Sequence, residues 1–320
     1  MNEIGSKLVP LIETAKFFID FRDAIEGESR FFFISLRTKG NNLNALKSLY
    51  DLLEVLPPIT LDEMKSIRLM KRTDTKFVTN RATLEQMLVC CRGLYFAQRV
   101  EGEVLSEYAT TYFDDAARHR MFAIHQAGHR PRTKVRVRTY VGSDITFLEV
   151  KRKDNHGKTT KRRVCVPSLK AVLEDRAGED FLRETAGMTW DDLIPTVGNR
   201  FRRITLVNTE KTERLTIDLD LKFHNYETGT DENMGDAVII ELKRDGRVPS
   251  PILPILRRLR IKPQGFSKYC IGSVVTNGNL RVNNFKLKLR MVRKTVAKPP
   301  VSQFQHLQDE VPHSSANPAL

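Results

Sequence analysis

The sequence predicts an α+β protein in which about eight antiparallel strands close into a β tunnel, with a charged lumen and helices packed outside. Two observations predict this fold class. Segments with apolar residues at alternate positions recur along the chain, separated by turn-like stretches. Arginine and lysine recur on the polar face of successive segments, where like charges on neighbouring strands would repel one another. Turning this face toward a bound anion removes the repulsion, although for any single strand a polar face in water is the simpler interpretation.

The chain divides into three parts by composition. Residues 1–44 are an N-terminal extension whose order the sequence does not specify, and residues 45–293 are the tunnel domain. Residues 294–320 are a tail rich in proline and polar residues, for which we expect disorder. A helix is expected over 43–55, where leucines keep helical spacing, and it ends at Leu-Pro-Pro because proline removes a backbone donor.

Strands are expected wherever apolar and polar residues alternate between turn signals. The segments are RTDTKFV (72–78), SEYATTYFD (106–114), KVRVRTY (134–140), ITFLEVKRK (145–153), TKRRVCVP (160–167), RRITLVN (202–208), RLTIDLDLKFH (214–224) and AVIIELKR (237–244). Helices are expected where apolar residues recur at three- and four-residue spacing, and these segments are 81–91, 114–128, 167–187 and 250–260. This order predicts hairpin-linked strands with helices inserted between them.

The charge balance indicates a polyanionic partner. Lysine and arginine number 53 against 39 aspartates and glutamates, a formal net charge of +14, which suits nucleic acid, a membrane surface or polyphosphate without choosing among them. The four cysteines form no C-x-x-C pair and accompany no spaced histidine cluster, so neither a zinc site nor a disulfide framework is indicated. The sequence shows neither a signal-peptide pattern nor an apolar stretch long enough to span a bilayer. We therefore expect a cytoplasmic protein, for which any association with membranes would come through a membrane-protein partner.

The charged strand faces suit a phosphate ligand. Lys134, Arg136 and Arg138 share one face of their strand, and Glu149 shares a face with Lys151 on the next, because strand side chains alternate with period two. Guanidinium groups bind phosphate oxygens in a bidentate way, and a restricted interior strengthens each contact. Carboxylates among them can hold a divalent cation that bridges phosphates, since magnesium takes one or two carboxylates plus substrate oxygens.

Nine sequence blocks in this order resemble the VTC domain, the polyphosphate polymerase domain of the triphosphate tunnel metalloenzyme or CYTH-like superfamily, in its bacterial stand-alone type. The blocks are RTDTKFVTN, YFDD, KVRVRTY, FLEVKRK, GKTTKRR, NRFRR, RLTIDLDLKF, VIIELK and KPQGFSKY, and they extend over about residues 56–275. The resemblance implies a tunnel that binds ATP with Mg²⁺ or Mn²⁺. It also implies transfer of the terminal phosphate to a growing inorganic polyphosphate chain.

Carried over by position, the resemblance implies a set of basic residues that contact phosphate and support catalysis. They are Lys76, Arg136, Arg138, Lys151, Lys161, Arg200, Arg214 and Lys268. Arg163 and Ser267 complete the expected substrate contacts. Glu241 is implied as a metal ligand, whereas Glu149 is either a second metal ligand or an ion-pair partner of Lys151.

Other polar residues are expected to have different roles. Asp218 and Asp220 are expected to balance neighbouring arginines rather than bind metal. Lys243 is expected at the rim, exposed to solvent. His125 is in the region where fungal family members have a phosphate-binding arginine, and both a ligand role and a structural role stay open.

The function predicted is that of a polyphosphate polymerase. A triphosphatase or tripolyphosphatase of the same fold is an alternative, because water can replace the phosphate acceptor, and the sequence does not separate the two. A non-catalytic module that binds polyphosphate or nucleic acid is a further alternative. Nucleic acid is disfavoured because base stacking needs aromatic residues, and the basic strands offer only Tyr140 and Phe147.

Overall fold

The computed structural model describes residues 49–65, 72–115, 119–246 and 248–299. The predicted extension over 1–44 and most of the predicted tail lie outside these ranges. The helix predicted over 43–55 is described from Leu49 onward and is helical through Glu54.

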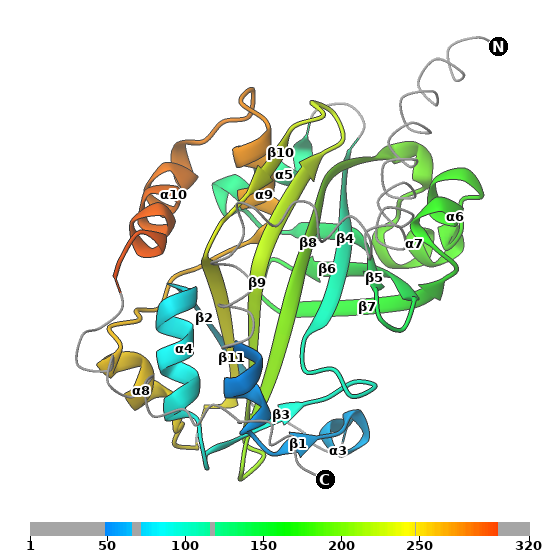
Figure 1. The fold of residues 1–320 in the computed structure, drawn as a ribbon. Helices are drawn as coiled ribbons and strands as arrows, with labels where there is room; N and C mark the ends of the chain where they lie inside the picture. The colour runs from blue at the N-terminus through cyan, green and yellow to red at the C-terminus, as the bar shows by residue number, and fades with distance from the viewer. Residues whose placement is uncertain (1–48, 66–71, 116–118, 247, 300–320) are drawn as a thin grey trace, which may run out of the picture.

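All eight predicted strands lie in one sheet (Figure 1). In spatial order they are β2 (Arg72–Asn80), β11 (Ala237–Asp245), β9 (Glu213–Asn225), β8 (Leu193–Asn208), β4 (Ser106–Asp115), β5 (Arg132–Tyr140), β6 (Ile145–Lys153) and β7 (Thr159–Val166). Each neighbouring pair is antiparallel. Short strands that alternation did not predict join this sheet: β1 (Pro58–Ile59), β3 (Tyr95–Gln98) and β10 (Asp231–Asn233). The α+β class with a mainly antiparallel sheet is therefore confirmed.

The sheet curls, but its two ends are not joined by backbone pairing in the described ranges. In Figure 1, β5, β6 and β7 run across the direction of the long strands β8 and β9. β2 and β7 end the strand order, and none of the described strand pairs joins them. The closed form of the tunnel therefore stays a prediction.

The described helices include every predicted one. Besides the helical residues 49–54, they are α3 (Leu61–Lys65), α4 (Arg81–Cys90), α5 (Arg120–Ala127), α6 (Leu169–Glu174), α7 (Glu179–Ala186), α8 (Ile252–Arg258), α9 (Lys268–Thr276) and α10 (Asn283–Val296), with a 3-10 turn η2 (Trp190–Asp192). The helix predicted over 167–187 is two helices, because Arg176 and Gly178 adopt positive φ angles between them. α9 and α10 were not predicted, and α10 extends into the predicted tail as far as Val296.

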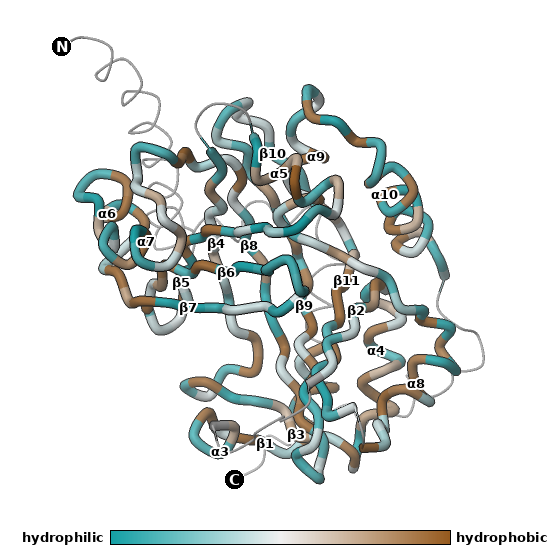
Figure 2. Tube along the Cα trace, turned by 180° about the vertical axis from the view of Figure 1, so that it is seen from behind, coloured by the Kyte–Doolittle hydropathy of each residue, from teal (hydrophilic) through white to brown (hydrophobic). Residues whose placement is uncertain are grey.

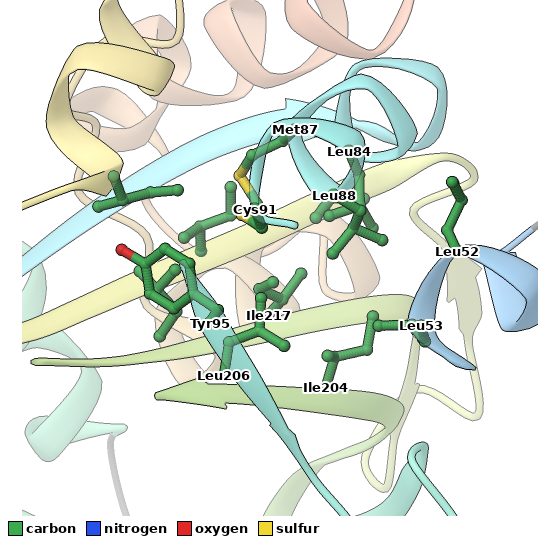
Figure 3. Packing of buried hydrophobic residues seen from close by; sticks show 14 of the residues in the cluster. Leu52, Leu53, Leu84, Met87, Leu88, Cys91, Tyr95, Ile204, Leu206 and Ile217 are labelled. Atoms are coloured by element: carbon green, nitrogen blue, oxygen red, sulfur yellow. The ribbon is translucent and has the colours of Figure 1, made fainter. Parts of the chain in front are cut away.

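Apolar strand residues pack under helices on the outer face of the sheet. α4 and the helical residues 49–54 cover β8, β9 and β11 through side chains such as Leu53, Met87, Leu206 and Ile217 (Figure 3). α6 and α7 cover β5 and β6 in a second cluster. Changes between hydrophilic and hydrophobic colour along the strands in Figure 2 follow this alternation of faces.

α9 is an exception to the prediction that helices pack outside. A Cβ atom added at Gly272 of α9 would lie 2.5 Å from Phe223 Cδ1 on β9 and 3.1 Å from Val197 Cγ2 on β8. Val197 lies opposite Tyr112, whose hydroxyl contacts Arg136. α9 therefore packs on the charged side of the sheet, and glycine allows its close approach.

Candidate functional site

Cross-strand pairing places the charged side chains on one face of the sheet. Directly opposed residues of an antiparallel pair point to the same side, and Glu149 lies opposite both Arg136 and Arg163. In the other half of the sheet, Glu241 lies opposite Lys76. We define the charged face by the residues that share this side or contact it, which are Asp74, Lys76, Lys134, Arg136, Arg138, Glu149, Lys151, Lys161, Arg163, Arg203, Arg214, Asp218, Glu241, Lys243, Ser267 and Lys268.

The segment Phe266–Lys268 contacts lysines of the charged face on two strands that are far apart in the sheet. Lys76 on β2 donates a hydrogen bond to the Phe266 carbonyl at 3.0 Å. Lys134 on β5 donates to Ser267 Oγ at 3.1 Å, and this hydroxyl also caps the N-terminus of α9. Because β11, β9, β8 and β4 separate β2 from β5 in the sheet, adjacent residues can bind both lysines only if the charged face curls around a common space.

Glu149 is held by two cations. Its Oε2 atom lies 2.5 Å from Arg136, and its Oε1 atom lies 2.5 Å from Lys161. The residue is 1% exposed, and burial would raise its pKa, but Arg136, Arg138 and Lys161 lower that pKa to about 2. The structure thus brings together an ion pair at Glu149, but its partners lie on β5 and β7 rather than at Lys151 on the same strand.

Arg138 is a buried cation between aromatic rings. Its Nε atom donates to Thr110 Oγ1 at 3.0 Å, and its guanidinium lies 5.6 Å from the Tyr108 ring centre and 5.7 Å from that of Phe201. Burial and the neighbouring Arg136 lower its pKa to about 10. No carboxylate of the described residues forms an ion pair with it, so an anionic ligand would supply the missing counter-charge.

Arg203 completes a second ion-pair group. Its Nε and Nη2 atoms lie 2.6 and 2.8 Å from the two carboxylate oxygens of Asp218, which Lys268 also binds. Burial would raise the pKa of Asp218, but Arg203 and Lys268 hold it well below its usual value. Burial lowers the pKa of Lys268 to about 8 despite this partner. The expectation that Asp218 balances neighbouring cations agrees with these contacts.

The structure does not bring Arg200 to the charged face. Arg200 lies opposite Ala109 on β4 and binds Glu107, with an Nη2 to Oε1 distance of 2.6 Å. Arg202, on the same side, binds Asp220, as expected for that aspartate. The residue from this block that faces Asp218 is Arg203. The alternation of apolar and polar residues in β8 indicates that Arg203 points to the charged face. Ile204 and Leu206 point to the core on the opposite side, which they share with Arg200 and Arg202.

Glu241 has a more open environment than Glu149 and Asp218. Its Oε2 atom lies 3.0 Å from Lys243 and its Oε1 atom 4.0 Å from Lys76, and about a quarter of the side chain is exposed. Burial would raise its pKa, but Lys243 and Lys76 lower it to about 2. Lys243 is therefore a partly buried partner of Glu241, which corrects its expected place at the solvent-exposed rim.

The remaining predicted residues differ in their surroundings. The Arg163 guanidinium lies 4.4 Å from the Phe147 ring centre, and Lys151 is exposed. Arg214 lies opposite Lys243 and donates to the Met64 carbonyl at 3.3 Å. All three share the charged face.

His125 has a structural hydrogen bond. Its Nε2 atom lies 2.9 Å from the Thr133 carbonyl. Burial and the nearby Lys134 lower the pKa of His125 to about 4, so its ring is neutral near pH 7. This environment favours the structural role over that of a phosphate ligand.

Two further residues of the site were not among the predicted contacts. Lys134 shares its face with Arg136, and burial together with Lys76 and Lys151 lowers its pKa. Tyr112 accepts a hydrogen bond from Arg136 at 3.4 Å. Burial would raise the pKa of Tyr112, but Arg136 and the nearby cations lower it to about 8. The alternation in β5 indicated Lys134, whereas nothing in the sequence indicated Tyr112.

Comparison with known proteins gives one family match and several solved structures of low similarity. Similar solved structures include a candidate adenylate cyclase from Bacillus halodurans (14% identity, TM-score 0.39, covering 68% of this chain and 100% of that one). A candidate adenylyl cyclase from Hippeastrum, described as having a dominant triphosphatase activity, is 15% identical with a TM-score of 0.38, covering 65% of this chain and 97% of that one. No curated protein matches the sequence. The model of the VTC domain matches residues 71–277, so the chain belongs to the VTC domain family.

Proposed function

We propose that the protein is a polyphosphate polymerase that transfers the terminal phosphate of ATP to a growing inorganic polyphosphate chain along the charged face. Family membership supports phosphoryl transfer as the class of reaction. The observation that carries the proposal is the meeting of Lys76 and Lys134, from strands far apart in the sheet, at adjacent residues of one segment. It supports a tunnel-like space lined with cations, as a polyanionic substrate requires.

The charged face carries more positively charged than negatively charged side chains. Glu149 and Asp218 each bind two cations, whereas none of the described carboxylates forms an ion pair with Arg138 or Lys134. Buried cations without counter-ions are unfavourable, and phosphate oxygens offer both charge and hydrogen-bond acceptors. A chain of phosphates would therefore relieve the excess of positive charge.

Divalent-metal use rests on Glu241. Within the described ranges, no three histidine, cysteine, aspartate or glutamate residues gather to form a metal site. A single carboxylate still fits Mg²⁺ or Mn²⁺, because magnesium commonly takes one or two carboxylates and completes its shell with water and substrate oxygens. Glu241 would hold such an ion, which when bound would neutralise charge on the phosphate oxygens.

Phosphoryl transfer depends mainly on alignment and charge neutralisation, which this site can provide. Arg136 and Arg138 would bind the triphosphate, with Arg136 oriented by Glu149. Lys268 and Ser267 would hold the terminal phosphate or the acceptor chain near the N-terminus of α9, where backbone N–H groups favour anions.

Incubation with ATP and Mg²⁺ or Mn²⁺, followed by separation of the products by size, tests the proposal. We expect long phosphate chains and ADP. Inorganic phosphate alone would show a hydrolase and contradict the polymerase assignment. Tight binding of triphosphate without turnover would instead support a non-catalytic binding module.

Replacing the proposed metal ligand tests its role. We expect Glu241→Gln to lower turnover roughly 100-fold or more with the fold intact, because the amide is a weaker ligand for the ion. Asp220→Asn is the matched control, since Asp220 binds Arg81 and Arg202 on the other face. Equal activities of the two variants would exclude Glu241 as the metal ligand, and circular dichroism checks that both fold.

A further inference from the structure

α10 buries one face and exposes the other. Phe285 and Val292 are buried against the body of the protein, and the helix contacts β2, β11, α5 and α9. Leu287 and Met291 are 65% and 44% exposed. Because residues four apart lie one above the other on a helix, these two large apolar side chains form one outward stripe.

Cations surround this apolar stripe. The exposed basic residues of the helix are Lys286, Lys288, Arg290, Arg293 and Lys294. At 3.6 residues per turn, Lys286 and Arg290 flank the stripe on one side and Lys288 on the other. The sequence from Arg281 to Lys298 contains no aspartate or glutamate. The outward surface of α10 is thus apolar at its centre and positively charged around it.

α10 is attached firmly to the sheet. Asn80, the last residue of β2, donates from its side-chain amide to the carbonyls of Thr295 and Lys298 at 3.2 and 2.6 Å. The helix lies on the opposite side of the molecule from α6 and α7 (Figures 1 and 2). A surface bound by α10 would therefore have a fixed orientation relative to the charged face.

We propose that α10 docks the protein on an anionic membrane surface, with Leu287 and Met291 inserted at the headgroup level and the flanking cations against lipid phosphates. Basic amphipathic helices bind membranes in this manner. A soluble polyanion would use the cations but would leave both apolar side chains in water, so the stripe favours lipid. Such docking requires no spanning segment, and none of the described helices is long and apolar enough to cross a bilayer.

Co-sedimentation of the full chain with vesicles tests docking. We expect binding to vesicles of phosphatidylcholine mixed with phosphatidylglycerol, weak binding to pure phosphatidylcholine, and a decline with salt. Lys286→Gln combined with Arg290→Gln and Lys294→Gln should lower the partition coefficient roughly 100-fold. Leu287→Ser combined with Met291→Ser should lower it roughly tenfold.

Matched controls remove equal charge and equal apolar surface elsewhere. The charge control combines Lys158→Gln, Lys170→Gln and Lys222→Gln, and the apolar control combines Leu94→Ser and Ile145→Ser, all at exposed positions. Both controls should bind vesicles like the unchanged protein. Docking by α10 is overturned if the α10 variants and their controls bind equally. It is also overturned if the charge variant loses affinity for soluble polyphosphate while vesicle binding is unchanged. Thermal melting checks folding, and the outcome does not depend on catalysis.

Discussion

Arg200 and Arg203 lie in the same strand, but their side chains point to opposite sides of the sheet. Arg203 binds Asp218 on the charged face, whereas Arg200 binds Glu107 on the other. We expect Arg203→Met to weaken tripolyphosphate binding roughly 10- to 100-fold, the range for loss of a charge-assisted hydrogen bond. Arg200→Met should change it less than about twofold. Calorimetric titration measures both affinities, and equal losses would contradict the assignment of faces.

The lysines of the site make binding sensitive to alkaline pH. Burial and nearby arginines lower the pKa values of Lys161 and Lys268 to about 8 each. Phosphate binds the protonated amines, so tripolyphosphate affinity should be highest below about pH 8 and fall as pH rises through this value. Titration at several pH values measures this decline.

The ligand also titrates, so a variant is needed to separate its protonation from that of the protein. Lys161→Met should retain the pH dependence that comes from the ligand and from Lys268, and lose the part that comes from Lys161. An identical profile for the variant and the unchanged protein would show that Lys161 does not titrate in this range.

Much of the site could be predicted from the alternation of residues in single strands. Which side chains form ion pairs with one another could not be predicted in this way. The shared face of Arg136 and Arg138 follows from their spacing, as does the phosphate-binding character of that face. Glu149 was expected either to bind metal or to pair with Lys151, and its ion-pair partners are instead Arg136 and Lys161, because cross-strand neighbours lie closer than residues two apart on one strand. Such contacts depend on register, which single-strand patterns do not fix.

Among the secondary-structure elements, the strands with clear alternation were predicted, whereas the short strands and the helices α9 and α10 were not. α9 has buried residues on all sides, so it shows no amphipathic stripe for a sequence pattern to reveal. β1 and β3 are too short to show a periodic pattern of apolar residues. β1 pairs with β3 in parallel, and β3 pairs with β8 in the antiparallel direction. The position of α9 on the charged side depends on tertiary packing.

The close approach of α9 to the sheet predicts a stability effect. Gly272→Ala would place a Cβ atom 2.5 Å from a Phe223 ring carbon, so we expect the free energy of unfolding to fall by about 1–3 kcal/mol. Gly278→Ala is the matched control, since no heavy atom lies within 4 Å of its added Cβ. Urea denaturation measures both variants. Equal stability would show that α9 shifts to accept the methyl group.

Across the whole molecule, the excess of cations on the charged face opposes folding when no anion is bound. Tripolyphosphate should therefore raise the melting temperature, and at one hundred times its dissociation constant it should add about 2.7 kcal/mol of stability. Differential scanning calorimetry measures the shift. Sodium chloride at equal ionic strength is the control, and an equal shift with salt would indicate screening rather than a bound ligand.

The pairing of β2 has a consequence for synthesis on the ribosome. In the described sheet, β2 pairs with β11, which lies near the other end of the chain, and residues 266–268 are made later still. A nascent chain therefore carries β2 without its partner strand until residue 245 has left the exit tunnel. Contacts so distant in sequence slow folding and leave a strand edge open to other chains. Of the strands that carry the site, β2 is thus the one that waits longest during translation for its partner strand.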